Sequence, residues 1–348
     1  MSDINSDKKI KILIVDDSAL MRRMIIDILN TEPGINVVGI AINGKMALTQ
    51  IEKLNPDVIT LDVEMPFMNG LETLREIRRI KPTPTIMLSS LTKAGAEVTL
   101  QALELGAVDF IQKPQTELEF QKIKTELISK IMAAAGAKQL KTMPAQKMIH
   151  DVVPIKASRN NRIKTVIIGS STGGPQALKE VVPYLPADLH AQILLVQHMP
   201  PKFTDMLAQR LDKISQINVR EAKEGDALER GLALMAPGNF HMTVDSNNRI
   251  KLNQEPQVWG VRPSVDITLA SAAKIYKNDL ISVILTGMGH DGSKGTGVVR
   301  QFGGYSIAED KSTCLIYGMP KSVIDAGNAD EIVPLHKIAN AIVNAVYK

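Results

Sequence analysis

Short apolar runs alternate with longer stretches in which apolar residues return every three or four positions. In the first third of the chain, the runs that resemble buried strands are residues 11–15, 35–41, 58–61, 85–88 and 108–111. Helical periodicity appears in residues 19–29, 46–53, 71–79 and 97–105, and again from residue 117 onwards. Five strand–helix alternations with uniformly apolar strands predict a doubly wound α/β domain around a parallel sheet.

The same pattern returns in the second half of the chain. Strand-like runs are residues 165–168, 193–196, 232–236, 241–244, 250–252, 281–285 and 306–308. Helical stretches are residues 176–180 and 265–276 and a segment that starts near Phe203. The sequence therefore predicts a second doubly wound α/β domain, and 348 residues suit two domains of ordinary size.

The two patterns are separated by a segment without sustained periodicity. From Gly136 to Lys164 there are seven Lys or Arg and one Asp, with prolines among them. A basic, aperiodic segment is typical of a flexible linker. We therefore predict a first domain at residues 1–135, a flexible basic linker at 136–162 and a second domain at 163–348.

Composition narrows the class of protein. The net charge is +4, and the basic excess lies in the linker and not on a folded face, so we expect no nucleic-acid partner. The polar start of the chain is no signal peptide and no apolar run could span a bilayer, so we expect a cytoplasmic protein without membrane insertion. A single cysteine, Cys314, excludes a disulfide framework within the chain and fits a reducing compartment.

Acidic residues gather at strand ends in the first domain. Asp16 and Asp17 follow the first strand, and Asp62 follows the third. Ligands bind at the carboxyl edge of an open parallel sheet, and three carboxylates there suit Mg²⁺. Ser89 and Lys113 follow the fourth and fifth strands, and a hydroxyl and a cation beside an acidic cluster suit a phosphoryl group.

In the second domain, a serine, a histidine and an aspartate follow predicted strands. Gly169-Ser170-Ser171-Thr172-Gly173 fits the G-x-S-x-G pattern, in which a sharp turn exposes the central serine before a helix. On its own, this turn could equally bind a phosphate. His198 and Asp291 also follow predicted strands, so Ser171, His198 and Asp291 should converge at one sheet edge. These three residue types suit nucleophilic acyl transfer. Their order along the chain is Ser, His, Asp, which differs from the order Ser, Asp, His in the α/β-hydrolases.

A rival interpretation concerns the loop after residue 285. Gly287-x-Gly289-x-x-Gly292 follows a strand and precedes a helix, and Glu309-Asp310 ends the next strand, as in a dinucleotide-binding fingerprint. Against it, His290 and Asp291 put bulk and negative charge where a pyrophosphate would lie. It also leaves Ser171 and His198 unexplained.

The first domain resembles the response-regulator receiver family. The resemblance rests on Asp16-Asp17, Asp62-Val63-Glu64-Met65-Pro66, Asn69-Gly70, Ser89 and Lys113-Pro114. It implies a flavodoxin-like fold in which Asp62 accepts a phosphoryl group. It also implies that Asp16, Asp17 and Asp62 hold Mg²⁺, and that Ser89 and Lys113 then bind the phosphoryl oxygens.

The second domain resembles the protein-glutamate methylesterases of bacterial chemotaxis. The matching segments are Ile168 to Gly174, Gln197 to Pro200, Arg262 to Asp266 and Leu285 to Gly292. The resemblance implies a Rossmann-like domain with Ser171 as nucleophile, His198 as base and Asp291 as acid. His290 departs from the family, in which an asparagine is familiar before the acid.

With the receiver in front, the resemblance covers essentially the whole chain. It implies a phosphorylation-activated hydrolase that removes γ-methyl groups from chemoreceptor glutamates, releases methanol and deamidates selected receptor glutamines. The phosphodonor would be the chemotaxis histidine kinase, and the ester hydrolysis would need no cofactor. Backbone N–H groups at Thr172, Gly173 and Met288 are oxyanion candidates. The alternative is a non-enzymatic phospho-switch whose second domain binds a dinucleotide or a protein.

Overall fold

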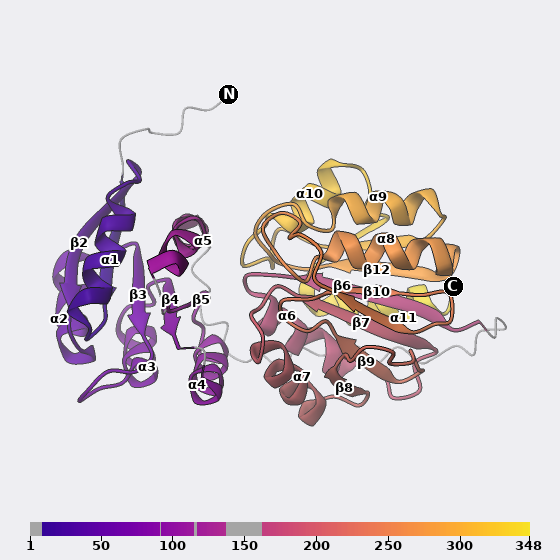
Figure 1. Cartoon of the computed structure of the whole chain (residues 1–348), viewed down its shortest axis with the longest axis horizontal. Helices are drawn as coiled ribbons and strands as arrows, with labels where there is room; N and C mark the ends of the chain where they lie inside the picture. The colour runs from indigo at the N-terminus through magenta and orange to yellow at the C-terminus, as the bar shows by residue number, and fades with distance from the viewer. Residues whose placement is uncertain (1–8, 91, 115–116, 137–161) are drawn as a thin grey trace. The chain divides into compact units, whose positions relative to one another are not determined.

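The chain folds into two compact units, Met1–Lys141 and Thr142–Lys348. The structure is a computed structural model that describes residues 9–90, 92–114, 117–136 and 162–348 (Figure 1). Each unit has its own parallel sheet and its own helices. Most of the predicted linker, residues 137–161, lies outside the described residues.

The first unit is built on a five-stranded sheet in the order β2-β1-β3-β4-β5. All of its strand pairs are parallel. The strands are β1 (Ile10–Val15), β2 (Ile35–Ala41), β3 (Val58–Asp62), β4 (Thr85–Ser89) and β5 (Asp109–Gln112). The helices are α1 (Ala19–Leu29), α2 (Gly44–Leu54), α3 (Gly70–Ile80), α4 (Lys93–Glu104) and α5 (Glu117–Gly136). This arrangement is the doubly wound fold that the pattern predicts.

Polar side chains set where the first four helices of this unit begin. Ser18, Asn43, Asn69 and Thr92 each accept a hydrogen bond from a backbone N–H in the first turn of the helix that follows. Such caps satisfy donors that a helix start otherwise leaves unpaired. Each strand-to-helix loop therefore ends at a defined residue, and its acidic residues stay at the carboxyl edge of the sheet.

The second unit is built on a seven-stranded sheet in the order β14-β13-β12-β6-β7-β9-β8. Every pair in this sheet is parallel. Its strands are β6 (Lys164–Ser170), β7 (Ala191–Gln197), β8 (Asn218–Glu221), β9 (Leu232–Met235), β12 (Leu280–Ile284), β13 (Tyr305–Glu309) and β14 (Glu331–Val333). The strand order reverses between β6 and β12, which makes the carboxyl ends of these two strands the place for a site.

Helices cover this sheet in two groups (Figure 1). One group contains α8 (Val265–Tyr276), α9 (Ser293–Gln301) and α10 (Met319–Asp325). The other contains α6 (Gly174–Val181), α7 (Phe203–Ile214) and α11 (Leu335–Val346). Ile167, Leu194, Ile284 and Leu269 belong to one buried apolar cluster, which joins the central strands to α8. Burial of such side chains supplies most of the stabilisation of a sheet between helices.

Two predicted strands do not join the main sheet. Residues 241–244 and 250–252 correspond to β10 (His241–Val244) and β11 (Ile250–Asn253), which pair with each other in an antiparallel hairpin. This hairpin leads into a segment that ends with the tight turn Val258-Trp259-Gly260-Val261, just before α8. The segment brings the turn to the rim of the site.

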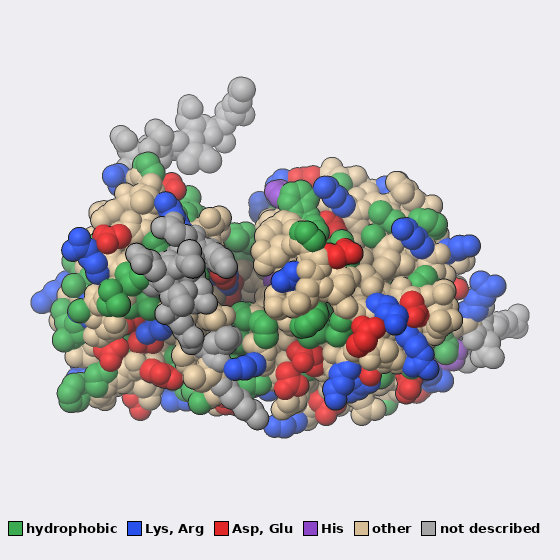
Figure 2. Space-filling model, viewed as in Figure 1, with side chains coloured by type: hydrophobic (Ala, Val, Ile, Leu, Met, Phe, Trp, Pro, Cys, Tyr) green, Lys and Arg blue, Asp and Glu red, His purple; other side chains and the backbone are tan. Residues whose placement is uncertain are grey.

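The surface of the second unit mixes charges of both signs. Figure 2 shows Lys and Arg interspersed with Asp and Glu over the face turned to the viewer, with hydrophobic side chains in small groups. Among the described residues, none of the helices combines the length and the apolar character needed to cross a bilayer.

Candidate active site

Three adjacent strands bring the predicted residues of the second unit together. Ser171 follows β6, His198 follows β7, and Asp291 lies in the exit loop of β12. Because β12, β6 and β7 are neighbours in a parallel sheet, their exit loops meet at one edge. This edge adjoins the point where the strand order reverses.

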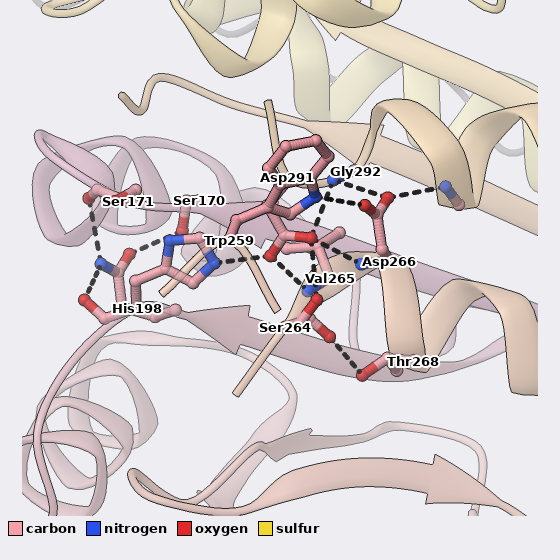
Figure 3. Close-up of polar contacts among 12 residues, drawn as sticks. Ser170, Ser171, His198, Trp259, Ser264, Val265, Asp266, Thr268, Asp291 and Gly292 are labelled. Atoms are coloured by element: carbon pink, nitrogen blue, oxygen red, sulfur yellow. Dashed lines mark hydrogen bonds and ion pairs between the residues drawn. The ribbon is translucent and has the colours of Figure 1, made fainter. Parts of the chain in front are cut away.

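The closest contact among the three joins His198 and Asp291. His198 Nε2 lies 2.8 Å from Asp291 Oδ2, and both side chains are nearly buried. In Figure 3 the imidazole ring lies between the serine segment and Asp291. With Nε2 donating to the carboxylate, Nδ1 keeps its lone pair and can accept a proton from Ser171. Among the described residues, no hydrogen bond to Ser171 Oγ is present, and such catalytic bonds often form only with substrate bound.

Both carboxylate oxygens of Asp291 accept hydrogen bonds from the start of α8. Ser264 Oγ donates to Oδ1 at 2.9 Å, the Asp266 N–H donates to Oδ1 at 2.9 Å, and the Val265 N–H donates to Oδ2 at 2.7 Å. Burial by itself would raise the pKa of Asp291, but the hydrogen bond and charge of His198, together with the backbone N–H groups, lower it below its usual value. The acid is therefore ionised and fixed beside the imidazole.

The serine turn is fixed by a buried glutamine. Ser170 Oγ donates to Gln197 Oε1 at 2.6 Å, and Gln197 Nε2 donates to the Ser171 carbonyl at 3.0 Å and the His198 carbonyl at 3.1 Å. One side chain thus ties the Ser171 turn to the segment that carries His198. Ser170 itself is fully buried and engaged, so Ser171 is the serine available for chemistry.

Glycines allow the turns around Ser171 to approach one another. Gly173 has φ of +80°, a left-handed conformation that favours glycine, and forms the N-cap of α6. A Cβ at Gly287 would lie 2.8 Å from Ser171 Cβ, so glycine there lets the loop after β12 pack against the serine. The Ser171 N–H donates to the Thr286 carbonyl at 3.0 Å and closes this contact.

The predicted oxyanion donors lie in these two turns. Within the described part of the chain, the backbone N–H groups of Gly173 and Met288 donate to no backbone or side-chain acceptor. Thr172, the third candidate, is buried, and its carbonyl accepts a hydrogen bond from Thr286 Oγ1 at 3.1 Å. Free N–H groups on both loops beside Ser171 suit the stabilisation of a developing negative charge.

The surroundings of Glu309 argue against the dinucleotide interpretation. Its side chain is fully buried, and its two oxygens accept hydrogen bonds from the Thr286 N–H at 2.8 Å and from Thr313 Oγ1 at 2.9 Å. Because it is fully buried, its carboxylate is out of reach of a ribose. Asp291, inside the glycine pattern, is committed to His198 and to the start of α8.

Several residues of the site were not predicted as site residues. Asp266 accepts hydrogen bonds from Trp259 Nε1 at 2.9 Å, from the Gly292 N–H at 2.9 Å and from the Gly295 N–H at 2.6 Å. The Trp259 ring lies with its centroid 5.9 Å from that of His290. Asp266 stands in a segment that carries the family resemblance, but no strand-end position distinguished it or Trp259.

The first unit gathers its predicted residues at its own sheet edge. One carboxylate oxygen of each of Asp16, Asp17 and Asp62 lies within 4.8 Å of the others. Lys113 Nζ lies 2.7 Å from Asp62 Oδ2 and 2.9 Å from Asp16 Oδ2. Burial raises the pKa of Asp62 to about 6, although the Lys113 charge opposes this shift. Hard oxygen donors at this spacing fit Mg²⁺.

Ser89 is engaged by α4 in this structure. Its hydroxyl accepts a hydrogen bond from Thr99 Oγ1 at 2.6 Å and donates to the Gly95 carbonyl at 3.3 Å. The Lys113 N–H donates to the Ser89 carbonyl at 2.7 Å, which places both residues beside Asp62 at neighbouring strand ends.

Comparison with known proteins tests the predicted family. A model of the CheB methylesterase family matches residues 166–342, and a response regulator receiver domain model matches residues 12–124. The chain is 47% identical to a protein-glutamate methylesterase/protein-glutamine glutaminase of Symbiobacterium thermophilum, over 99% of both chains. The corresponding protein of Thermotoga maritima is 44% identical over 98% of this chain and all of its own length.

The chain belongs to the protein-glutamate methylesterase/protein-glutamine glutaminase family. The crystal structure of the Thermotoga maritima CheB methylesterase catalytic domain is 48% identical and has a TM-score of 0.51, covering 52% of this chain and 97% of that one. The predicted family, fold class and enzyme class are thereby confirmed. The chain is a carboxylic ester hydrolase, a chemotaxis methylesterase with a receiver domain, and the non-enzymatic alternative is wrong.

Proposed function

We propose that Ser171, His198 and Asp291 hydrolyse the γ-methyl esters of chemoreceptor glutamates. The contact between His198 Nε2 and Asp291 carries the proposal, because it leaves Nδ1 as the base for a serine on the next strand. Ser171 Oγ attacks the ester carbonyl while Nδ1 takes its proton. The Gly173 and Met288 N–H groups, with Thr172 as a further candidate, stabilise the oxyanion.

The acyl-enzyme then passes its acyl group to water. His198 gives the proton to the departing methoxide, so methanol leaves and a Ser171 ester of the receptor glutamate remains. Water attacks this ester, gives its proton to Nδ1, and releases a free carboxylate and the serine hydroxyl. A receptor glutamine follows the same path with ammonia as the leaving group, since both substrates present a γ-carbonyl.

The receiver supplies control in this proposal. Asp62 accepts a phosphoryl group from the chemotaxis histidine kinase, and Asp16, Asp17 and Asp62 hold the Mg²⁺ that the transfer needs. Lys113 and Ser89 then bind the phosphoryl oxygens. Mg²⁺ when bound offsets the negative charge that gathers during transfer.

We assign residues 1–135 to the receiver, 136–162 to a flexible basic linker and 163–348 to the catalytic domain. The division into two compact units supports this assignment. We place the enzyme in the cytoplasm, where the receptor segments that carry methyl groups lie, with no membrane insertion and no nucleic-acid partner.

Ser171→Ala tests the proposed chemistry. It should lower turnover by several orders of magnitude, because the nucleophile is lost, while the fold stays intact. The measurement is methanol release from labelled receptor membranes. Ser170→Ala is the matched control: it loses one buried hydrogen bond, worth about 1 kcal/mol, but keeps the nucleophile. Near-normal methanol release by Ser171→Ala would refute the proposal.

A further inference from the structure

Two buried acids of the site, Asp291 and Asp266, each accept hydrogen bonds from the start of the helix that carries or follows the other. Asp291, just before α9, accepts the N–H groups of Val265 and Asp266 at the start of α8. Asp266, in the first turn of α8, accepts the N–H groups of Gly292 and Gly295 at the start of α9 on its Oδ1. Because helix starts carry unpaired donors and partial positive charge, this exchange stabilises both carboxylates and locks the two helices together. The position of Asp291 therefore depends on Asp266.

Trp259 completes the set of donors to Asp266. Its indole Nε1–H donates to Asp266 Oδ2 at 2.9 Å (Figure 3). The residue occupies a two-residue hairpin turn with φ of +56°, followed by Gly260 with φ of +78°. Val258 and Val261 close this turn with hydrogen bonds of 3.2 and 3.0 Å. Such turns favour Asn-Gly, and a bulky residue with positive φ costs roughly 1 kcal/mol or more, so the indole bond offsets a local strain.

The other face of the indole is at the surface. Trp259 is 50% exposed, Lys294 Nζ lies 4.8 Å from the ring centroid, and His290 packs at 5.9 Å. The ring thus contacts buried Asp266 through its N–H and the side chains of Lys294 and His290 through its π-system. It is also the chain's single tryptophan.

We propose that Asp266 is a positioning residue of the esterase reaction that acts through Asp291, and that Trp259 holds Asp266 in this role. The proposal rests on the proposed function, because Asp291 matters for turnover only if His198 is the base. Asp266 touches neither His198 nor Ser171 through any hydrogen bond within the described residues. It fixes the start of α9, and with it the carboxylate that orients the imidazole.

Charge strengthens this dependence. The groups next to Asp266 are Asp291, the Trp259 N–H and the α9 N–H groups. Further away, His198 contacts Asp291, and Lys294 and His290 contact the indole. Burial, followed by the charge of Asp291, raises the pKa of Asp266, so its ionised form relies on the three N–H donors. When ionised, it adds a second negative charge near the imidazole and favours the protonated ring.

The test is a double-mutant cycle with Asp266→Asn and Trp259→Phe. In Asp266→Asn, the amide oxygen stays with the α9 N–H groups, so the amide NH₂ faces the Trp259 N–H, donor against donor. We expect kcat to fall about 100-fold for Asp266→Asn and about tenfold for Trp259→Phe. The double variant should be at least about fivefold more active than Asp266→Asn alone, because removing the indole donor relieves the clash.

A second readout separates positioning from simple loss of structure. Loss of the Asp266 charge should move the acid limb of the pH–rate profile to lower pH. The same shift should appear in the NMR titration of His198 in a Ser171→Ala background, where activity plays no part. Tyr276→Phe is the matched control: it removes the hydroxyl that bonds Asn248 at the other end of α8 and should leave both readouts unchanged.

Each part of the inference can fail by itself. If the Asp266→Asn and Trp259→Phe losses simply add, Trp259 does not hold Asp266. If the His198 titration of folded Asp266→Asn matches the parent, Asp266 does not act through Asp291. If Ser171→Ala keeps its activity, the proposed function fails instead, and the NMR titration still decides the role of Asp266.

Discussion

At the scale of single residues, Asp62 couples the receiver's stability to pH. Its folded pKa of about 6 lies above its usual value, so the folded state binds the Asp62 proton more tightly than the unfolded state does. The resulting destabilisation is absent below the unfolded pKa and complete above pH 6, where a shift of about two units corresponds to roughly 3 kcal/mol.

Asp62→Asn should therefore stabilise the metal-free receiver by up to about 3 kcal/mol at pH 7.5 and hardly at all at pH 4. Calorimetry of the whole chain can follow the receiver transition, whereas tryptophan fluorescence reports only the second unit, which contains Trp259. Asp17→Asn is the control, because Asp17 is exposed in the same acidic cluster and should gain much less. An equal gain at both pH values would contradict the assignment.

The residues at the strand ends could be predicted from the sequence. The residues that hold them in place by hydrogen bonds could not. Asp62, Ser171, His198 and Asp291 each follow an apolar strand, so the sequence itself indicates their common edge. Trp259 reaches Asp266 only through the turn at residues 258–261, and nothing local in the sequence marks that contact. The same holds for Gln197, whose three hydrogen bonds depend on how β6 and β7 pair.

At the scale of elements, a reciprocal cap starts α3 and closes the loop after Asp62. Asn69 Oδ1 accepts the Glu72 N–H at 2.9 Å, and Glu72 Oε2 accepts the Asn69 N–H at 3.1 Å. Asn69→Ala should lower the receiver's stability by about 1 kcal/mol. Calorimetry measures the shift, with Asn30→Ala as control, since Asn30 ends α1 and caps through its backbone N–H. Equal shifts in both variants would mean that the cap contributes nothing.

Two long helices follow the predicted pattern closely, whereas a third, α11 (Leu335–Val346), is absent from the predicted elements. The segments 19–29 and 265–276 correspond to α1 and α8 to the residue. Short edge strands were missed: β8 (Asn218–Glu221) and β14 (Glu331–Val333) have too few residues for an apolar run to stand out. The β10–β11 pair shows the other limit, because an alternating run does not reveal which strand it pairs with.

At the scale of the whole molecule, α4 is the element through which phosphorylation can act. Ser89 cannot turn to a phosphoryl group on Asp62 without giving up its bonds to Thr99 and Gly95. If phosphorylated Asp62 recruits Ser89 as proposed, these two contacts with α4 are broken, and a change of this kind can shift the population of a restrained state.

If the unphosphorylated receiver restrains the catalytic domain, deletion of residues 1–135 should raise basal receptor demethylation. Asp62→Asn in the full-length protein should keep activity low even with phosphodonor and Mg²⁺ present. Methanol release measures both, and the deletion combined with Ser171→Ala verifies that the activity comes from this site. A truncated protein no faster than the unphosphorylated whole chain would rule out restraint by the receiver.

The central position of β6 between β7 and β12 also determines when the enzyme can first work. Ser171 and Asp291 follow neighbouring strands of the sheet, β6 and β12. Along the chain, however, they are far apart, because every element from α6 to β12 lies between them. A chain of which only β6 and β7 have left the ribosome contains Ser171 and His198 but not Asp291, and the serine turn still lacks the Thr286 carbonyl. Contacts between such distant segments form late, because the intervening loop must first be closed. If the proposed triad is correct, a growing or refolding chain stays inert towards esters until β12 enters the sheet, and regain of turnover marks the completion of folding.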